Sequence, residues 1–343
     1  MSSPVRVLQY GVGPIGLACI RSILTKQETG QLVLAGAVDI APEKTGRDVA
    51  ELLGGDLLPT GIVVREDAVA ALAETTPDVV LHTTSSFLDH VHGQIEECIH
   101  SGVPVVSSTE ELAFSYDRHP ERSAALHKEA VKHGVAVVGT GVNPGYAMDT
   151  LALMATGVCC DVSEVHAVRV VDAGKRRMPL QVKVGAGLSV KAFEEKKATG
   201  AFGHIGLRES LFFVAKGLGW PLDRVDEQLH PVLAEAEVST PFLTVAPGSV
   251  AGIHHSITGY VGGKPLLSLD LKMFVGAEEP RDAVRVVGDP PVDLVVRGGI
   301  FGDTATVAAL INAIPLVMHA SPGLKTMMDL PVPRAFACSP NSG

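Results

Sequence analysis

The residues that point most directly to chemistry form a glycine-rich run near the start of the chain, GVGPIG from Gly11 to Gly16. This GxGxxG run follows a strand-like segment, Val5 to Tyr10, and precedes a helix-like one around Ala18 to Leu24. In that setting the first glycine permits a tight turn, the second lets the backbone approach a pyrophosphate, and the third allows close helix–strand packing. The run therefore predicts a dinucleotide site built from Gly11, Gly13, Pro14, Ile15 and Gly16.

An acidic residue, Asp39, closes the next strand-like segment, Leu32 to Val38. A carboxylate at this place accepts hydrogen bonds from an adenosine ribose and repels a 2′-phosphate, which favours NAD. Lys44 and Arg47 follow closely, and their positive charges could neutralise the extra phosphate of NADP. The sequence therefore leaves both NAD and NADP open as cofactors.

A pair of carboxylates, Glu110 and Glu111, comes just after the strand-like segment Val103 to Val106. In open α/β sheets ligands lie outside the carboxyl ends of the strands. A glutamate there, close to a nicotinamide, could exchange protons with a substrate nitrogen or oxygen while hydride moves. Acids are also common in the first turn of a helix, where they complement its dipole, so the spacing supports either role. At the same edge we expect further cofactor contacts from Thr83, Thr84, Ser85 and Asn143.

The elements that must position these residues alternate between strand and helix in the first half of the chain. Short, wholly apolar strands such as Val79 to Leu81 and Val135 to Val138 predict a parallel sheet with helices on both faces. The fold class is therefore α/β, with a Rossmann-type doubly wound sheet.

The pattern changes after Asn143-Pro144-Gly145, where longer segments with period-two alternation begin, such as Ser249 to Val261 and Leu266 to Phe274. They predict a second, α+β domain built on a mostly antiparallel sheet. We expect a dinucleotide-binding domain over residues 1–146 and a substrate and dimerisation domain over 147–302. A C-terminal helix and tail, 303–343, should return to the first domain.

Composition narrows the class of protein. The chain has 343 residues, with 28 Lys plus Arg against 38 Asp plus Glu, and a formal net charge of −10. This acidic balance argues against nucleic acid or an anionic membrane as a partner. We see no secretory signal and no apolar stretch near the ~20 residues of a membrane span. Five cysteines without CxxC spacing fit reduced thiols, so we expect a cytoplasmic enzyme.

Two histidine pairs, His90 with His92 and His254 with His255, are of a residue type that binds metal ions. No carboxylate or cysteine falls at a supporting spacing, and residues two apart on a helix face different ways. The sequence therefore predicts no metal site.

Several segments in order along the chain together resemble the 2,4-diaminopentanoate dehydrogenases and the related native amine dehydrogenases. They are Ser108 to Leu112, Gly141 to Tyr146, Lys183 to Ser189, Gly302 to Thr306 with Asn312 to Pro315, and Ser321 to Leu324. The fold of this group is similar to that of dihydrodipicolinate reductase, and its members are typically homodimers that use NAD or NADP. The His-His pair and Pro-Ser-Gly-Thr-Ala run of those reductases are missing around Asp172 to Leu180, which argues against reductase activity.

The resemblance implies a reaction: a small amine is oxidised to a carbonyl and ammonia, or a short aldehyde or ketone is reductively aminated. It also implies that Glu110 or Glu111 handles the ammonia and its protons, and we favour Glu110, nearer the strand end. Tyr146 would line an apolar substrate pocket. Weaker pocket candidates, for each of which core packing is an alternative role, are Met178, Leu180, Phe202, His204 and Thr306.

Two other functions remain compatible with these residues. One is a Rossmann oxidoreductase that reduces a small carbonyl or cyclic imine without ammonia. The other is a nucleotide-sensing protein whose second domain docks a partner. Ammonium dependence separates the amine dehydrogenase from the first, and turnover of any kind separates it from the second.

Overall fold

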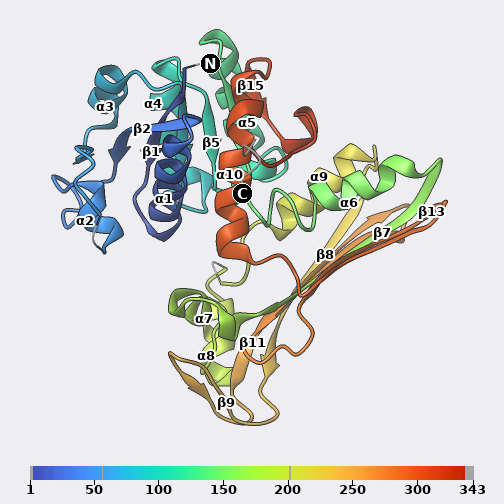
Figure 1. Ribbon diagram of the computed structural model, residues 1–343. Helices are drawn as coiled ribbons and strands as arrows, with labels where there is room; N and C mark the ends of the chain where they lie inside the picture. Colours follow the sequence, from blue (N-terminus) through green and yellow to red (C-terminus); the bar gives the residue numbers. More distant parts are fainter. Residues whose placement is uncertain (1–2, 56, 201, 337–343) are drawn as a thin grey trace, which may run out of the picture. The chain divides into compact units, whose positions relative to one another are not determined.

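The computed structural model describes residues 3–55, 57–200 and 202–336. The chain forms two compact units, drawn in Figure 1. The first contains the residues up to Gly145 together with the segment that starts at Phe301, and the second runs from Tyr146 to Ile300. The C-terminal segment therefore belongs to the same unit as the N-terminal strands.

The first unit is built on a seven-stranded sheet in the order β15-β6-β5-β4-β1-β2-β3. All of its strand pairs are parallel. The strands are β1 (Val5–Tyr10), β2 (Leu32–Val38), β3 (Val64–Arg65), β4 (Val79–His82), β5 (Val105–Ser107), β6 (Ala136–Gly139) and β15 (Gly323–Lys325). The predicted parallel sheet is confirmed. Strands β3 and β15 were not predicted, because strands this short carry no readable periodicity.

Helices cover both faces of this sheet. They are α1 (Pro14–Glu28), α2 (Val49–Leu53), α3 (Ala68–Thr75), α4 (Leu88–His100), α5 (Pro120–Lys132) and α10 (Gly302–Met318), with the 3-10 helices η1 (Glu110–Phe114) and η4 (Met327–Asp329). Buried apolar residues of α3, α4 and α5, such as Ile95 and Leu126, form one core cluster with Leu8 and Val80 of the strands. On the other face α10 packs against α1 and against β4, β5 and β6 (Figure 1). This two-sided cover explains why the central strands β4, β5 and β6 are buried at every position and mostly apolar.

The second unit contains a six-stranded sheet in the order β14-β13-β7-β12-β11-β8. Only the β7–β12 pair is parallel. Its strands are β7 (Asp161–Asp172), β8 (Arg224–Leu233), β11 (Val250–Val261), β12 (Lys264–Phe274), β13 (Arg281–Asp289) and β14 (Val292–Arg297). The predicted, mostly antiparallel sheet is confirmed, although β8 and β13 were missed.

Shorter elements complete the second unit. They are α6 (Thr150–Ala155), η2 (Thr156–Val158), η3 (Ala173–Lys175), α7 (Met178–Lys183), α8 (Val190–Lys197), α9 (Leu207–Gly217), β9 (Val238–Ser239) and β10 (Thr244–Val245). The α9 helix packs on β11 and β12, and α6 packs on β7 and β13. The amphipathic α9 buries Leu211 and Phe213, which gives this sheet an apolar core.

A buried ion pair fixes the last residue of the second unit. Arg169 of β7 and Asp282 of β13 are 3% and 1% exposed and are paired with each other. Arg169 also donates to the carbonyl oxygen of Ile300 (2.8 Å), and the N–H of Ile300 donates to Asp282 (2.7 Å). The chain is thus held at the point where it leaves this sheet.

Among the residues that the structure describes, no helix is both long and apolar enough to cross a membrane. The cysteines Cys19, Cys98, Cys159 and Cys160 are free thiols, and Cys338 lies outside the described residues.

Candidate functional site

The glycine-rich turn after β1 has the geometry that a dinucleotide requires. Gly11 has a φ of 92°, and a Cβ atom there would lie 2.7 Å from the carbonyl oxygen of Thr83. A Cβ on Gly16 would collide with the carbonyl oxygen of Gly11. A Cβ on Gly13, by contrast, would meet no atom within 4 Å. The first and third glycines are therefore required by the turn itself, while the second leaves open space where a pyrophosphate can approach the backbone.

The helix that follows this turn suits an anion. It begins at Pro14, its N-cap is Gly13, no side chain caps it, and its first turn contains no acidic residue. Proline at the first helical position has no N–H to satisfy and is preset for helical φ. The N-terminal end of α1, which includes Ile15 and Gly16, thus presents backbone N–H groups and the positive end of the helix dipole to a phosphate.

Asp39 lies directly after β2 and beside the glycine turn. Its carboxylate accepts hydrogen bonds from the N–H of Val12 (2.7 Å) and of Ala41 (2.9 Å), and it pairs with Lys44 (3.0 Å). Partial burial acts to raise the pKa of Asp39, but these hydrogen bonds and the Lys44 charge together hold it below its usual range. Arg47 instead pairs with Glu51 at 3.1 Å. Of the two basic residues weighed for a 2′-phosphate, Lys44 is therefore the one that adjoins Asp39.

The loop after β4 is tied to the glycine turn and to the loop after β5. The hydroxyl of Thr83 donates to the carbonyl oxygen of Gly11 (2.9 Å). Ser85 contributes its carbonyl oxygen, which accepts a hydrogen bond from the hydroxyl of Thr109 at 2.8 Å. The predicted cofactor residues of this loop therefore connect the turn at Gly11 with the segment that carries the two glutamates.

A buried polar network lies beneath that loop and was not singled out from the sequence. The imidazole of His82, at the end of β4, is hydrogen-bonded to Ser107 (2.9 Å), Gln94 (2.8 Å) and Thr84 (3.0 Å). Burial lowers the pKa of His82 to about 4, so the ring is neutral at pH 7. A polar residue that ends a wholly apolar strand is the sequence signal that could have indicated this network.

The two adjacent glutamates have different surroundings. Glu111 is 6% exposed, and its carboxylate accepts a hydrogen bond from the N–H of Leu88 (2.8 Å) at the start of α4. The same carboxylate pairs with His119 (3.0 Å) and with Arg118 (3.6 Å). Glu111 therefore caps a helix and joins it to the segment before α5, a positioning role for which its charge is already used.

Glu110 is half-buried on the first turn of η1, and its neighbours fix the backbone on both sides. Thr109 is bonded to Ser85 as described above, and the N–H of Glu111 donates to the carbonyl oxygen of Ser86 (3.2 Å). The next residue, Leu112, packs its backbone so closely on Gly139 of β6 that any side chain there would collide with it. Glu110 thus lies on a fixed turn at the carboxyl ends of β4, β5 and β6.

Two more predicted residues lie at this edge of the first unit. Asn143 belongs to the loop after β6, in which the Asn143–Pro144 peptide bond is cis. Thr306, on the second turn of α10, lies beside the same loop, since a Cβ atom added to Gly141 would be 3.7 Å from its methyl group. The structure therefore gathers the glycine turn, both glutamates, Asn143 and Thr306 at the edge where strands β1, β4, β5 and β6 end.

The remaining predicted pocket residues belong to the second unit. Tyr146 is its first residue and is half-buried, as is Leu180 of α7, whereas Met178 is 48% exposed. Phe202 packs edge-to-face on Phe193 of α8, with ring centroids 5.1 Å apart. This contact shows that Phe202 takes part in local packing around α8.

His204 also belongs to the second unit and is uncharged at neutral pH. Burial is the main cause, and the positive charges of Lys183, His255 and Arg169 add to it, so the pKa of His204 lies well below its usual value. A neutral imidazole is compatible with an apolar substrate pocket, because it adds no desolvated charge.

Comparison with known proteins decides the family. The model of the 2,4-diaminopentanoate dehydrogenase C-terminal domain matches residues 146–341. Over 321 residues, 88% of this chain and 91% of the relative, the sequence is 30% identical to 2,4-diaminopentanoate dehydrogenase of Acetoanaerobium sticklandii. The chain belongs to the 2,4-diaminopentanoate dehydrogenase family.

Other relatives of this family are similar over nearly the whole chain. An amine dehydrogenase of Streptomyces virginiae is 24% identical over 355 residues, covering 96% of each chain. The solved structure of an amine dehydrogenase from Mycobacterium smegmatis superposes with a TM-score of 0.84, at 25% identity, over 97% of this chain and 98% of that one. The family resemblance drawn from short motifs is thus confirmed.

The two histidine pairs, His90 with His92 and His254 with His255, have separate partners. His90 is hydrogen-bonded to Ser85 (3.1 Å), while His92 pairs with Glu96 (3.4 Å). His254 and His255 are adjacent on β11 and bind different acids, Asp270 at 2.7 Å and Glu227 at 2.9 Å. Neither pair converges on one point.

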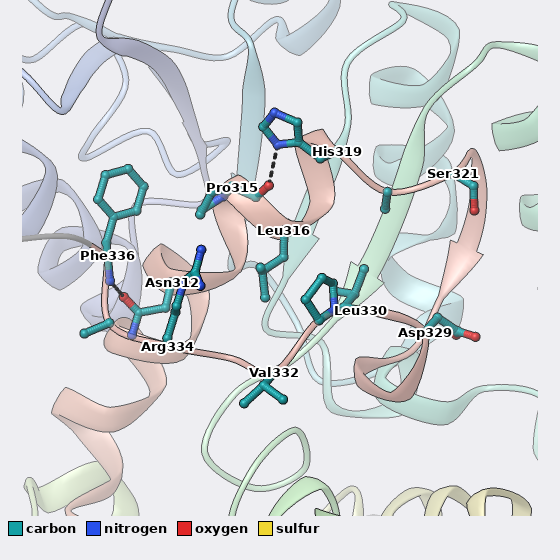
Figure 2. Close-up of a pocket in the computed structure, with 13 residues that line it drawn as sticks. Asn312, Pro315, Leu316, His319, Ser321, Asp329, Leu330, Val332, Arg334 and Phe336 are labelled. Atoms are coloured by element: carbon teal, nitrogen blue, oxygen red, sulfur yellow. Dashed lines mark hydrogen bonds between the residues drawn. The ribbon is translucent and has the colours of Figure 1, made fainter. Parts of the chain in front are cut away.

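A cavity of about 630 Å³ lies elsewhere in the first unit (Figure 2). It is formed where the chain after η4 folds back along the C-terminal half of α10, and its lining includes Leu316, His319, Leu330 and Arg334. The N–H of Phe336 donates to the side-chain oxygen of Asn312 (2.7 Å), which holds this segment in place. None of the predicted site residues lines the cavity, so it lies apart from the site at the carboxyl ends of the strands.

Proposed function

We propose that this protein is an NAD(P)-dependent amine dehydrogenase, an oxidoreductase acting on CH–NH₂ donors. It oxidises a small amine to the carbonyl and ammonia, and in reverse it aminates a short aldehyde or ketone. One observation carries the proposal: Glu110 lies on a fixed turn at the strand-end edge that also holds the dinucleotide turn. Membership of the 2,4-diaminopentanoate dehydrogenase family and likeness to amine dehydrogenases support it.

The cofactor is held by groups of the first unit. The turn from Gly11 to Gly16 and the N-terminus of α1 bind the pyrophosphate, while Asp39 accepts hydrogen bonds from the adenosine ribose. A bound nicotinamide supplies the hydride acceptor for amine oxidation and the hydride donor for the reverse reaction. Thr83, Thr84, Ser85 and Asn143 frame the cofactor at the strand ends.

The role of Glu110 follows from what reductive amination demands. Ammonium must lose a proton before its nitrogen can attack a carbonyl, and a carboxylate within reach can accept that proton. The carbinolamine that results must lose water, and the same carboxyl group can return the proton to the departing hydroxyl. The iminium ion that is left is positive, so the carboxylate then stabilises it electrostatically. The reaction consumes one carbonyl, one ammonium, one proton and one hydride, and it releases a protonated amine and water.

Glu111 is a positioning residue that acts through Glu110 and does not itself transfer protons. By capping α4 and pairing with His119 and Arg118, it fixes the backbone from which Glu110 projects. The substrate's carbon substituents would contact Tyr146, and the weaker pocket candidates are Met178, Leu180, Phe202, His204 and Thr306.

Further expectations concern assembly and location. We propose a homodimer, in line with the family resemblance, and a cytoplasmic protein whose acidic charge keeps it from nucleic acid and anionic membranes. Size-exclusion chromatography with light scattering tests the dimer, which a monomer mass at micromolar concentration would contradict.

The test of the proposed function is the ammonium requirement of NAD(P)H oxidation. The purified chain is mixed with NADH or NADPH and a panel of short aldehydes and ketones, with and without ammonium chloride, and sodium chloride serves as the ionic-strength control. In the opposite direction, a panel of small amines that includes 2,4-diaminopentanoate is offered with NAD or NADP. We expect cofactor oxidation only with ammonium. Equal rates without it would indicate a carbonyl or cyclic imine reductase, and tight nucleotide binding with no turnover would indicate a sensor.

A further inference from the structure

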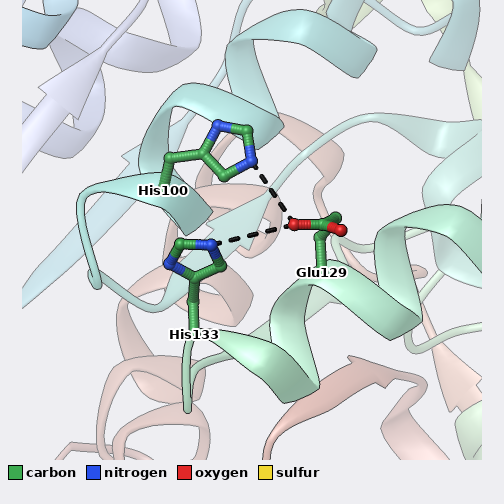
Figure 3. A group of neighbouring side chains, drawn as sticks. All are labelled: His100, Glu129 and His133. Carbon is green, nitrogen blue, oxygen red and sulfur yellow. Dashed lines mark ion pairs between the residues drawn. The ribbon is translucent and has the colours of Figure 1, made fainter.

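A cluster of three metal-ligating side chains lies in the first unit, apart from the proposed site. His100 ends α4, Glu129 lies in the last turn of α5, and His133 follows that helix directly. One ligand atom from each lies within 4.8 Å of the other two. Figure 3 shows both imidazole rings turned toward the Glu129 carboxylate. We propose that these residues bind a divalent transition-metal ion of the zinc class.

The distances within the cluster suit a shared ion better than direct hydrogen bonds. The Nε2 atoms of His100 and His133 lie 3.6 and 3.7 Å from Oε2 of Glu129, beyond ordinary hydrogen-bond length. Two ligand atoms on one tetrahedral zinc ion lie about 3.4 Å apart, since each bond is about 2.1 Å long. A small contraction of three partly exposed side chains therefore completes the first three positions, and water can fill the fourth.

The fold holds the ligands together through the two helices. In the β4-α4-β5-α5-β6 segment the strands are parallel, so both helices run back and end at the same edge of the sheet. Ile95 and Ile99 of α4 and Leu126 and Ala130 of α5 are fully buried in one core cluster. The separation between the helix ends is thus set by packing, and a metal ion finds its ligands already placed.

The electrostatics at the C-terminal ends of α4 and α5 also favour binding of a cation. The negative ends of the α4 and α5 dipoles point to the same place. Lys132 is the competing group, since its ammonium lies 2.9 Å from Glu129, but it is mostly exposed and can turn away into water.

The ion would act on stability rather than on turnover. The cluster lies at the amino ends of the strands, whereas the dinucleotide turn and Glu110 lie at their carboxyl ends. Bound metal would tie α4 to α5 and so favour the folded form over the unfolded chain. This site is independent of the proposed amine chemistry, and either can fail without the other.

The test is calorimetric titration of the full-length chain, freed of metal by a chelator, with zinc chloride alone. We expect one site per chain that His100→Gln, Glu129→Gln and His133→Gln each weaken at least about tenfold, together with loss of the zinc-induced rise in Tm. His92→Gln is the matched control, because His92 pairs with Glu96 on α4 and no third ligand joins them among the residues that the structure describes, so this variant should bind zinc like the parent chain.

A variant that leaves all three ligands in place keeps the test decisive even if the histidine variants fail to fold. Lys132→Ala removes only an exposed competitor for Glu129, so it should raise the affinity for zinc. Unchanged or lower affinity in Lys132→Ala would overturn the proposal. So would undiminished binding in the histidine variants, or no stoichiometric site in the parent chain.

Discussion

Exchanging each of the two adjacent glutamates for glutamine should show which one is needed for turnover and which one mainly stabilises the fold. Glu110→Gln keeps the size of the side chain but can no longer accept a proton, so we predict that turnover falls by about 100-fold or more. That loss corresponds to about 2.7 kcal/mol of activation free energy. The backbone of Glu110 is held by its neighbours and the amide keeps the size of the side chain, so we expect the variant to fold and to lose less unfolding free energy than Glu111→Gln.

Glu111→Gln should instead lower the free energy of unfolding more than it lowers turnover. Its carboxylate is 6% exposed and holds the Leu88 N–H, His119 and Arg118. The amide can still accept from Leu88 but loses the negative charge that faces His119 and Arg118. Hydrogen bonds to charged groups are worth about 1.5–3 kcal/mol, and His119 and Arg118 regain some solvation, so we predict a loss of about 2 kcal/mol in unfolding free energy.

The two variants are compared by urea unfolding and by steady-state NAD(P)H absorbance with saturating ammonium. Glu121→Gln, a change in the exposed first turn of α5, serves as the control for handling and should match the parent chain in both assays. If Glu111→Gln abolished turnover while remaining as stable as the parent, and Glu110→Gln retained full activity, our assignment would be wrong.

Three further variants test other parts of the account. Asp39→Ser removes the carboxylate that would face a 2′-phosphate, so the ratio of kcat/KM for NADP over NAD should rise about tenfold or more, and an unchanged ratio would place the ribose elsewhere. Burial lowers the pKa of His82 to about 4, so its stabilising effect is complete above pH ~6.5 and is lost as pH falls toward 4. This should cost about 2 kcal/mol between pH 7 and pH 5 in urea unfolding, and His82→Gln should show a shallower dependence. Asp282→Ala strands the buried charge of Arg169, so we predict a loss of about 3–5 kcal/mol, and a Tm like that of the parent chain would refute it.

The sequence was most informative where local chemistry determines structure. The parallel strands of the first unit are buried on both faces, so their apolar runs were readable without any partner. The turn at Gly11 to Gly16 was equally readable, because its glycines are required by the turn itself. By contrast, β8 alternates weakly at the edge of its sheet, with exposed residues on both faces, and so carried no clear period.

The candidate site was only partly predictable for a different reason. Spacing cannot separate Glu110 from Glu111, because the difference depends on Leu88, which lies 23 positions before Glu111 and is brought to it by the fold. The same holds for the cluster of His100, Glu129 and His133. Its first ligand ends α4, and the other two lie in the last turn of α5 and just after it, so no short motif in the sequence contains all three.

The most direct test of the central claim is the fate of nitrogen. A ketone that is turned over is supplied with NAD(P)H and ¹⁵N-ammonium, and the product is analysed by mass spectrometry alongside the cofactor consumed. We predict one ¹⁵N atom in the amine product for each NAD(P)H oxidised, and a rate of amine formation that falls about 100-fold or more in Glu110→Gln. An alcohol product without ¹⁵N, formed at the same rate whether or not ammonium is present, would contradict the account.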